Sequence, residues 1–202
     1  MSATVRAAPH AGNRSEDARQ RAIAAALARD VDGSFERLVQ AYQHRVYGFV
    51  LQLIADSREA EEIAQETFVA AYRALLGYDS ARTRALSLRS WLYTIALNRV
   101  RNRSRSRKRA AAHEGEVASM SVLVAEDPSV SAERAQQIAA LRRALATLAL
   151  RYREAVVLRH LEGLSYGEIA TLLAQPVGTA KANVHRGLLL LRQNVDLGEY
   201  QC

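Results

Sequence analysis

One stretch decides the fold of this protein: residues 164–192, with the sequence LSYGEIATLLAQPVGTAKANVHRGLLLLR. Ser165 followed three residues later by Glu168 is a capping box, which predicts the start of a short helix. Pro176 cannot continue that helix, because it lacks a backbone N–H and restricts the residue before it. A second helix therefore begins near Val177, and the stretch consists of two helices joined by a tight turn.

The second helix of this stretch has one apolar and one basic side. Its apolar residues repeat at steps of four and three, which predicts one buried stripe: Val184, Leu188 and Leu191. Its charged and titratable residues include no acid: Lys181, His185, Arg186 and Arg192. Two helices joined by a tight turn, the second basic on its open face, are typical of a DNA-reading helix-turn-helix. An ordinary helical hairpin with a solvated basic side is the alternative.

Composition narrows the class of protein. The 202 residues leave room for one large or two small domains, and only three prolines and ten glycines interrupt Ala/Leu/Arg/Glu-rich segments, which favours an all-α fold. A net charge of +7 suits a polyanionic partner. No apolar run reaches the length of a membrane span and the N-terminus lacks the apolar core of a signal peptide, so we expect a cytoplasmic protein without membrane insertion. The only cysteine is Cys202, which excludes a disulfide framework and a thiolate zinc site.

Shifts in composition divide the chain. We expect a disordered lead-in over residues 1–16, because they are small and polar. A first helical domain covers residues 17–109, and a flexible linker without a helical stripe covers residues 110–132. A second helical domain covers residues 133–195 and contains the helix-turn-helix. The predicted fold is therefore all-α, with two small helical domains joined by a flexible linker and the second ending in the helix-turn-helix.

The first domain contains an acidic helix face. Asp56 followed by Glu59 is a capping signal, and Glu59, Glu62 and Glu66 then recur at steps of three and four with Gln65 alongside. Such a face is either a solvated helix side or a docking surface for a basic partner. A di-iron site is not favoured, because no histidine stands at the Glu-x-x-His spacing.

A basic run follows on the next predicted helix. Between Ser80 and His113 the chain has ten Lys/Arg residues and no acid. The arginines and the lysine from Arg101 to Arg109 follow one another too regularly to share one helix face. They are expected to point around the helix axis, which suits contacts with DNA phosphates that do not depend on the base sequence.

Five segments carry a resemblance to a known family. They are Phe35, Leu38, Tyr42 and Val46 at helical spacing, then DSREAEEIAQETF over residues 56–68, WLYTIALN over 91–98, LRHLEGLSYGEIA over 158–170, and PVGTAK over 176–181. In this order, the chain from about residue 30 to residue 194 resembles bacterial sigma factors of the extracytoplasmic-function (ECF) group. Members of that group are not enzymes and need no cofactor or metal. They bind core RNA polymerase, bring it to a promoter and help to open the duplex.

The resemblance implies a role for each matching segment. Core-polymerase binding falls on Asp56, Glu59, Glu62, Gln65 and Glu66. Reading and melting of the −10 element fall on Arg89, Trp91, Asn98, Arg101, Asn102 and Arg105. Reading of the −35 element falls on Thr179, Lys181, Ala182, His185 and Arg186. The implied partners are core RNA polymerase, promoter DNA and an anti-sigma factor.

The chain departs from the family pattern at several positions. Alanine stands at Ala182, where the family often has a polar residue, and at Ala180, where it has a bulky aliphatic. Because of these departures, we expect a −35 preference that is unusual or weak. A stand-alone helix-turn-helix regulator is the alternative function, but it would need a dimer interface, and the second domain offers no spare apolar helix for one. An enzyme is disfavoured because the five histidines are scattered and no phosphate loop or nucleophile–base spacing is present.

Overall fold

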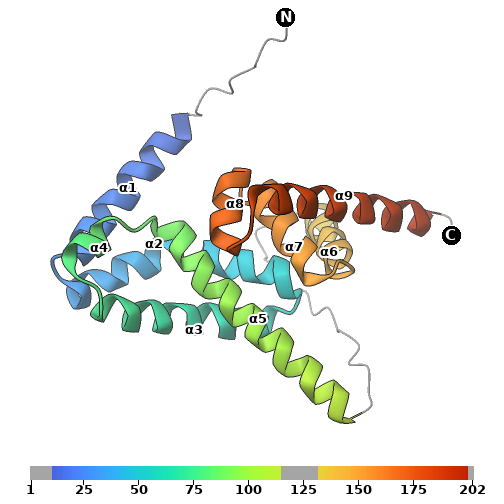
Figure 1. The fold of residues 1–202 in the computed structure, drawn as a ribbon, viewed down its shortest axis with the longest axis horizontal. Helices are drawn as coiled ribbons and strands as arrows, with labels where there is room; N and C mark the ends of the chain where they lie inside the picture. The colour runs from blue at the N-terminus through green and yellow to red at the C-terminus, as the bar shows by residue number, and fades with distance from the viewer. Residues whose placement is uncertain (1–10, 115–131, 200–202) are drawn as a thin grey trace, which may run out of the picture.

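The computed structural model describes residues 11–114 and 132–199, and the regular structure of these residues is helical throughout (Figure 1). The first lobe, residues 11–114, contains α1 (Ala11–Leu27), α2 (Val31–Ile54), α3 (Ser57–Leu76), α4 (Ser80–Arg84) and α5 (Leu88–Glu114). The second lobe, residues 132–199, contains α6 (Ala132–Ala146), α7 (Leu150–Val156), a π-helical turn (Val157–Leu161), α8 (Tyr166–Leu173) and α9 (Val177–Glu199). The predicted all-α fold class is confirmed.

Aspartate side chains cap three helices of the first lobe. They accept hydrogen bonds from backbone N–H groups three residues further on: Asp30 from Gly33 at 3.0 Å, Asp56 from Glu59 at 2.8 Å and Asp79 from Arg82 at 2.7 Å. A carboxylate at this position satisfies a donor that the helix leaves free and lies at the positive end of the helix dipole. The cap predicted at Asp56 is confirmed, and it fixes where α3 begins.

The core of the first lobe forms where α2, α3 and α5 pack together. Leu38 and Val46 on α2, Ile63 on α3 and Leu92 on α5 are fully buried. The ring of Tyr93 on α5 stacks on Phe49 of α2, with ring centroids 4.2 Å apart. α5 therefore has its first half fixed in the core, and this sets the direction of its basic second half.

The second lobe seats α9 against α7 through a glycine. A Cβ on Gly187 would lie 2.5 Å from Cγ2 of Val156, so only glycine allows this close approach of the two helices. The inward side of α9 is Ala180, Val184, Gly187 and, half-buried, Leu191. Leu188 was predicted to belong to the buried stripe, and this was wrong, because its side chain is 40% exposed. The side of α9 that faces α7 contains Gly187 and not Leu188.

Several boundaries differ from the sequence prediction. α1 begins at Ala11, within the segment expected to be a disordered lead-in, and α5 continues to Glu114, within the expected linker. α9 continues to Glu199, past the expected domain end at residue 195. Residues 1–10 and 115–131, which hold the rest of the predicted lead-in and linker, lie outside the described residues.

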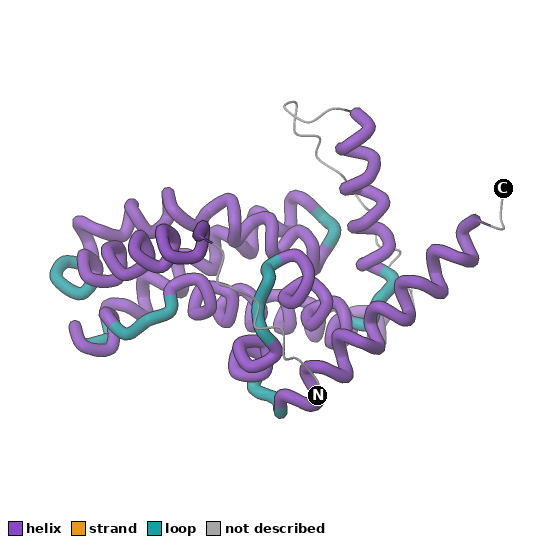
Figure 2. Tube along the Cα trace, turned by 90° about the horizontal axis from the view of Figure 1, so that it is seen from above, coloured by secondary structure: helices purple, strands orange, loops and turns teal. Residues whose placement is uncertain are grey.

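The two lobes share one hydrophobic core. A single cluster of buried residues runs from α2, α3 and α5 into α7, the π-helical turn and α8. α6 and α7 pack on α2, while α8 packs on α5 (Figure 1). The C-terminal part of α9 projects away from the other helices in both views (Figures 1 and 2). The two lobes therefore pack together as one body, and the C-terminal part of α9 extends from it.

Candidate functional site

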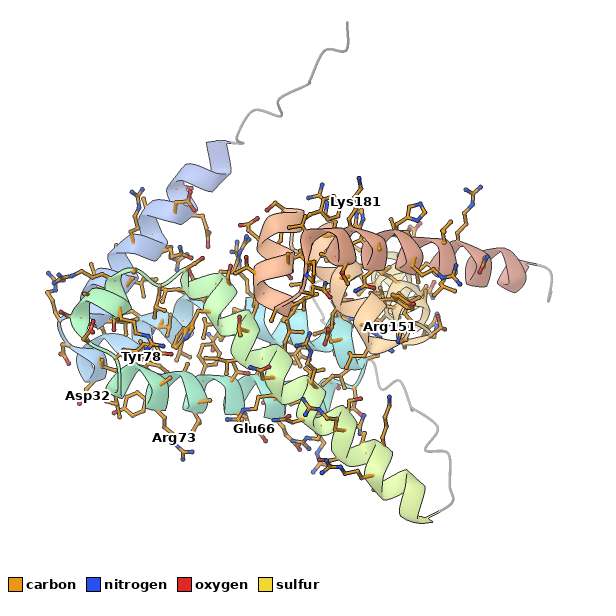
Figure 3. The ribbon with its side chains drawn as sticks, viewed as in Figure 1. Asp32, Glu66, Arg73, Tyr78, Arg151 and Lys181 are labelled. Atoms are coloured by element: carbon orange, nitrogen blue, oxygen red, sulfur yellow. The ribbon has the colours of Figure 1, made fainter. Side chains whose placement is uncertain are left out.

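The basic side of α9 is open. Thr179, Lys181, Ala182, His185 and Arg186 are all exposed, opposite the buried inward side of the helix. Figure 3 shows Lys181 pointing outward from the top of the molecule. The segment from residue 177 to residue 193 contains no acid to neutralise this surface. These residues form a basic helix face that can enter a DNA groove.

The turn before α9 is built as the sequence predicts. Ser165 and Glu168 form both hydrogen bonds of the capping box, at 3.2 and 2.8 Å. Ala174 then ends α8 with a left-handed φ of 52°, the conformation that glycine would adopt at lower cost. The amide of Asn183 on α9 donates to the side-chain oxygen of Gln175 at 3.3 Å. These local hydrogen bonds fix the turn before α9, and they therefore fix the direction in which the exposed side of α9 points.

The first half of α5 presents Trp91 beside a hollow. Trp91 is half-buried, and its ring lies 6.2 Å from that of Tyr78, whose other neighbour is the Arg82 guanidinium. Arg89, also half-buried, donates its backbone N–H to Gln20 of α1 at 3.3 Å. The hollow measures about 460 Å³ and lies between α5 and α8; its lining is Ser87, Ser90, Trp91, Thr94, Gly167, Glu168, Thr171 and Leu172. An aromatic and several hydroxyls thus border a space open to a ligand.

The second half of α5 divides its charges among distinct faces. Asn98, Asn102, Arg105 and Arg109 recur at steps of four, three and four and are exposed. Every fourth residue on another face turns toward the acids of α3: Arg99, Arg103 and Arg107. The basic residues from Arg101 to Arg109 therefore do point to different sides of the helix, but Arg103 and Arg107 are paired with acids of α3 in this structure. Helical periodicity assigns them to ion pairs within the lobe.

Arg101 has a partner in the other lobe. Its Nε and one terminal nitrogen donate to the two carboxylate oxygens of Glu154 on α7, at 2.8 and 2.7 Å. This bidentate bond raises the pKa of the Arg101 guanidinium above its ordinary value. Arg101 was predicted to contact −10 DNA. In this structure its guanidinium instead donates both hydrogen bonds to Glu154.

The acidic face of α3 is only partly open. Glu59 is 6% exposed and is bonded to Arg107, whereas Glu62 and Glu66 keep nearly half of their side-chain surface. Arg103 reaches Glu62 at 3.6 Å and Glu66 at 3.2 Å. The predicted open face therefore loses Glu59, which turns inward because α5 crosses above it. Figure 3 shows Glu66 on the lower side of α3, near α5.

Other predicted residues on α3 lie nearby. Asp56 serves as the N-cap, and Gln65 is exposed with its amide 3.4 Å from Glu61. Gln65 and Glu61 also border a groove of about 510 Å³ between α2 and α3, together with Val39, Gln43, His44, Tyr47, Ala64 and Phe68. The structure thus joins Gln65, Glu62 and Glu66 into one accessible strip beside a groove with both apolar and polar lining residues.

Sequence reasoning missed the buried polar residues that join the lobes. Glu154 and Arg153 stand directly before an apolar segment, from Ala155 to Leu158, and both are buried. A charged pair directly before an apolar run is the signal that could have identified them, because buried charges need partners. No partner can be named from that signal, since Arg101 lies more than fifty residues away.

Metal binding and membrane crossing are two further properties that a helical protein can have. Residues 11–114 and 132–199 hold no group of three or more His, Cys, Asp or Glu side chains that could bind a metal ion. Within the same residues, no helix has the length and apolar character needed to cross a membrane.

Known proteins share this arrangement of segments. The family model for sigma-70 region 2 matches residues 38–110, and the model for sigma-70 region 4 matches residues 138–191. The RNA polymerase sigma-H factor of Pseudomonas aeruginosa is 34% identical over 76% of this chain and 81% of its own length. The ECF RNA polymerase sigma factor SigW of Bacillus subtilis is 33% identical over 80% of this chain and 89% of its own length.

Solved structures show the same fold. The sigma factor RpoE in complex with the anti-sigma factor NepR, from Bartonella quintana, matches with a TM-score of 0.67 at 23% identity, over 80% of this chain and 96% of that one. CnrH in complex with the cytosolic domain of CnrY matches with a TM-score of 0.65 at 23% identity, over 89% and 98%.

Proposed function

The chain belongs to the ECF group of bacterial sigma factors and acts in transcription initiation, and we propose that it does so through three separate surfaces. One reads the −35 element, one holds the −10 region and one binds core RNA polymerase. The observation that carries this proposal is the open basic face of α9, set by a capped helix-turn-helix and free of acids.

The −35 surface consists of Thr179, Lys181, Ala182, His185 and Arg186. Lys181, His185 and Arg186 recur at steps of four and one, so their side chains can enter one major groove together. An arginine fork can bond both acceptors of a guanine edge, which gives base discrimination in addition to charge. The small Ala182 contributes space and apolar contact, and base reading rests on its neighbours.

The −10 surface lies on α5. Trp91 offers an aromatic platform beside the hollow between α5 and α8, and single strands are held by stacking combined with phosphate contacts. The exposed stripe of Asn98, Asn102, Arg105 and Arg109 continues from there along the helix. Arg99, Arg103 and Arg107 are left out of this surface, because their charges are used by α3.

The polymerase surface is the strip of Glu62, Gln65 and Glu66 with the groove between α2 and α3. The exposed carboxylates suit a basic partner, and the groove offers it an apolar contact. Asp56 and Glu59 support this surface from within, by capping α3 and by bonding Arg107.

Other properties of the protein follow from this assignment. We propose that it has no catalytic activity of its own and works in the cytoplasm, where RNA polymerase transcribes. An anti-sigma factor is a proposed partner as well. This is supported by the two solved relatives, RpoE in complex with the anti-sigma factor NepR and CnrH in complex with the cytosolic domain of CnrY.

A run-off transcription assay tests the proposed function. Core RNA polymerase is incubated with a genomic promoter library, with and without this protein. The proposal expects discrete transcripts only when the protein is present, and the Glu62→Lys/Glu66→Lys variant should lose them together with pull-down of core. Wild-type pull-down of core by that variant would remove the polymerase assignment. Binding of an operator without any effect on transcription by core would favour the stand-alone regulator.

A further inference from the structure

Buried polar side chains tie the second lobe to α5 and α2. Glu154 of α7, whose side chain is 4% exposed, holds Arg101 of α5 by two hydrogen bonds. Arg153, next to Glu154, donates to the backbone carbonyl of Leu53 at the end of α2. These bonds cross a boundary between segments that are distant in the chain, so they hold one lobe on the other.

A second bond lies on the same side of α5. The hydroxyl of Tyr93 donates to Glu162 at 2.5 Å, while its ring stays stacked on Phe49. Burial, followed by the charge and hydrogen bond of Glu162, raises the pKa of the Tyr93 hydroxyl far above its ordinary value, which keeps it protonated as a donor. Tyr93 is therefore anchored in the first lobe and bonded to the second.

The second lobe also lies across from the side of α5 that carries Trp91. The hollow beside Trp91 is bounded on its other side by Gly167, Glu168, Thr171 and Leu172 of α8. This hollow of about 460 Å³ thus has Trp91 on its α5 side and the second lobe on its α8 side. The arrangement with both lobes together, here termed the closed state, narrows access to the proposed −10 surface.

Arg101 stands at the centre of this arrangement. It lies three residues after Asn98 and four before Arg105, which places it next to the exposed stripe of α5. A guanidinium fork fits a carboxylate and a phosphate by the same bidentate geometry. Glu154 therefore occupies the donors that a strand lying along the stripe would use.

We propose that Arg101 exchanges partners: Glu154 binds it in the closed state, and a DNA phosphate binds it once the second lobe moves away. Glu154 and the nucleic acid then compete for one residue, and the free protein is held back from DNA by its own carboxylate. This inference rests on the proposed role of α5 in DNA binding. A protein whose binding-competent state is only partly populated shows an affinity reduced by that fraction, so weakening the closed state raises the apparent affinity.

The test uses the full-length chain and three variants. Glu154→Gln removes the charge that holds Arg101, and Tyr93→Phe removes only the hydroxyl that bonds Glu162 while keeping the stacked ring. Glu16→Gln is the matched control, because it breaks an exposed ion pair with Arg45 inside the first lobe. Each protein is titrated against a labelled single-stranded DNA of mixed sequence, and its radius of gyration is measured by small-angle X-ray scattering.

The expected results differ among the variants. Glu154→Gln should bind single-stranded DNA about tenfold more tightly and scatter as a more extended particle, because a hydrogen bond between charged groups is lost from the closed state. Tyr93→Phe should change both quantities in the same direction, by about threefold in affinity. Glu16→Gln should change neither. If circular dichroism shows that Glu154→Gln does not fold, Tyr93→Phe alone decides.

Two outcomes would overturn the proposal. Expansion of Glu154→Gln or Tyr93→Phe without tighter DNA binding would show that the closed state does not compete with nucleic acid. Tighter binding by Glu154→Gln alone, with Tyr93→Phe unchanged and no expansion, would show a local charge effect in place of a partner exchange. Failure of the proposed function appears separately, as absence of promoter-specific run-off transcripts in a protein that still shows these changes.

Discussion

Alanine at Gly187 tests how closely α9 is seated on α7. The added Cβ would lie 2.5 Å from Cγ2 of Val156 and 3.3 Å from the carbonyl oxygen of Tyr152, where ordinary contacts are 3.4–4 Å. Val156 is 4% exposed and has little room to move, so the helices must separate. Overpacking of this kind costs about 1–3 kcal/mol, against a gain of up to about 1 kcal/mol from replacing glycine in a helix.

The same substitution at Gly178 is the control. Gly178 lies in the same helix, and a Cβ there would meet no heavy atom within 4 Å. The helix gain is smaller at Gly178, which lies in the first turn of α9, so the overpacking at Gly187 decides the difference. The free energies of unfolding should differ by roughly 1–2 kcal/mol, with Gly187→Ala the less stable. Urea denaturation followed by circular dichroism measures this difference. Equal free energies for the two variants would refute the close seating of α9.

Three further predictions concern the charges of α5, the capping box of α8 and base recognition by α9. Arg105→Ala should flatten the dependence of log K on log salt for duplex promoter binding by about 0.9, whereas Arg103→Ala should leave the slope unchanged and lower the free energy of unfolding by at most about 1 kcal/mol; the reverse pattern would contradict the division of α5. Burial alone would raise the pKa of Glu168, but its hydrogen bonds with Ser165 outweigh burial and hold the pKa below the ordinary 4.5. The Glu168 carboxylate therefore stabilises the protein above that pH, and this contribution is lost as the pH falls through the folded pKa, whereas the bond to the Ser165 hydroxyl does not titrate. Glu168→Gln should be less stable at neutral pH but lose less stability on acidification, and parallel unfolding curves across this pH range would exclude the effect. Arg186→Ala should weaken binding to the cognate −35 element by roughly 1–3 kcal/mol and relax the preferred base there; a selection from randomised −35 sites with unchanged preference would remove Arg186 from base reading.

Local signals in the sequence predicted the parts of the fold that depend on neighbouring residues. The capping box at Ser165 and the cap at Asp56 lie within three residues of their partners, so spacing alone is sufficient. The exposure of Lys181 and Arg186 followed from the 3.6-residue period in the same way. The helix-turn-helix and its open basic face could therefore be predicted from the amino-acid sequence alone.

Contacts between distant residues could not be predicted. Glu59 looked like part of an open acidic face, but its partner Arg107 is 48 residues away and its orientation depends on how α5 crosses α3. The sequence did not identify Gly187 as a buried position, because glycine has no side chain and so does not appear in an apolar repeat. In the structure it is the residue at which α9 lies closest to Val156 of α7. The pairing of Arg101 with Glu154 depends on the packing of the two lobes, which spacing along the chain does not encode.

Footprinting of one promoter in the presence of core RNA polymerase shows whether the protein reads the −35 element and opens the −10 region in the same complex. Protection from DNase I reports the α9 contact at the −35 element, and permanganate reactivity of thymines reports the opened −10 region. Both signals should appear on the same promoter, and only when core and this protein are added together. Protection of a two-fold symmetric site by the protein alone, with no reactive thymines after core is added, would contradict it.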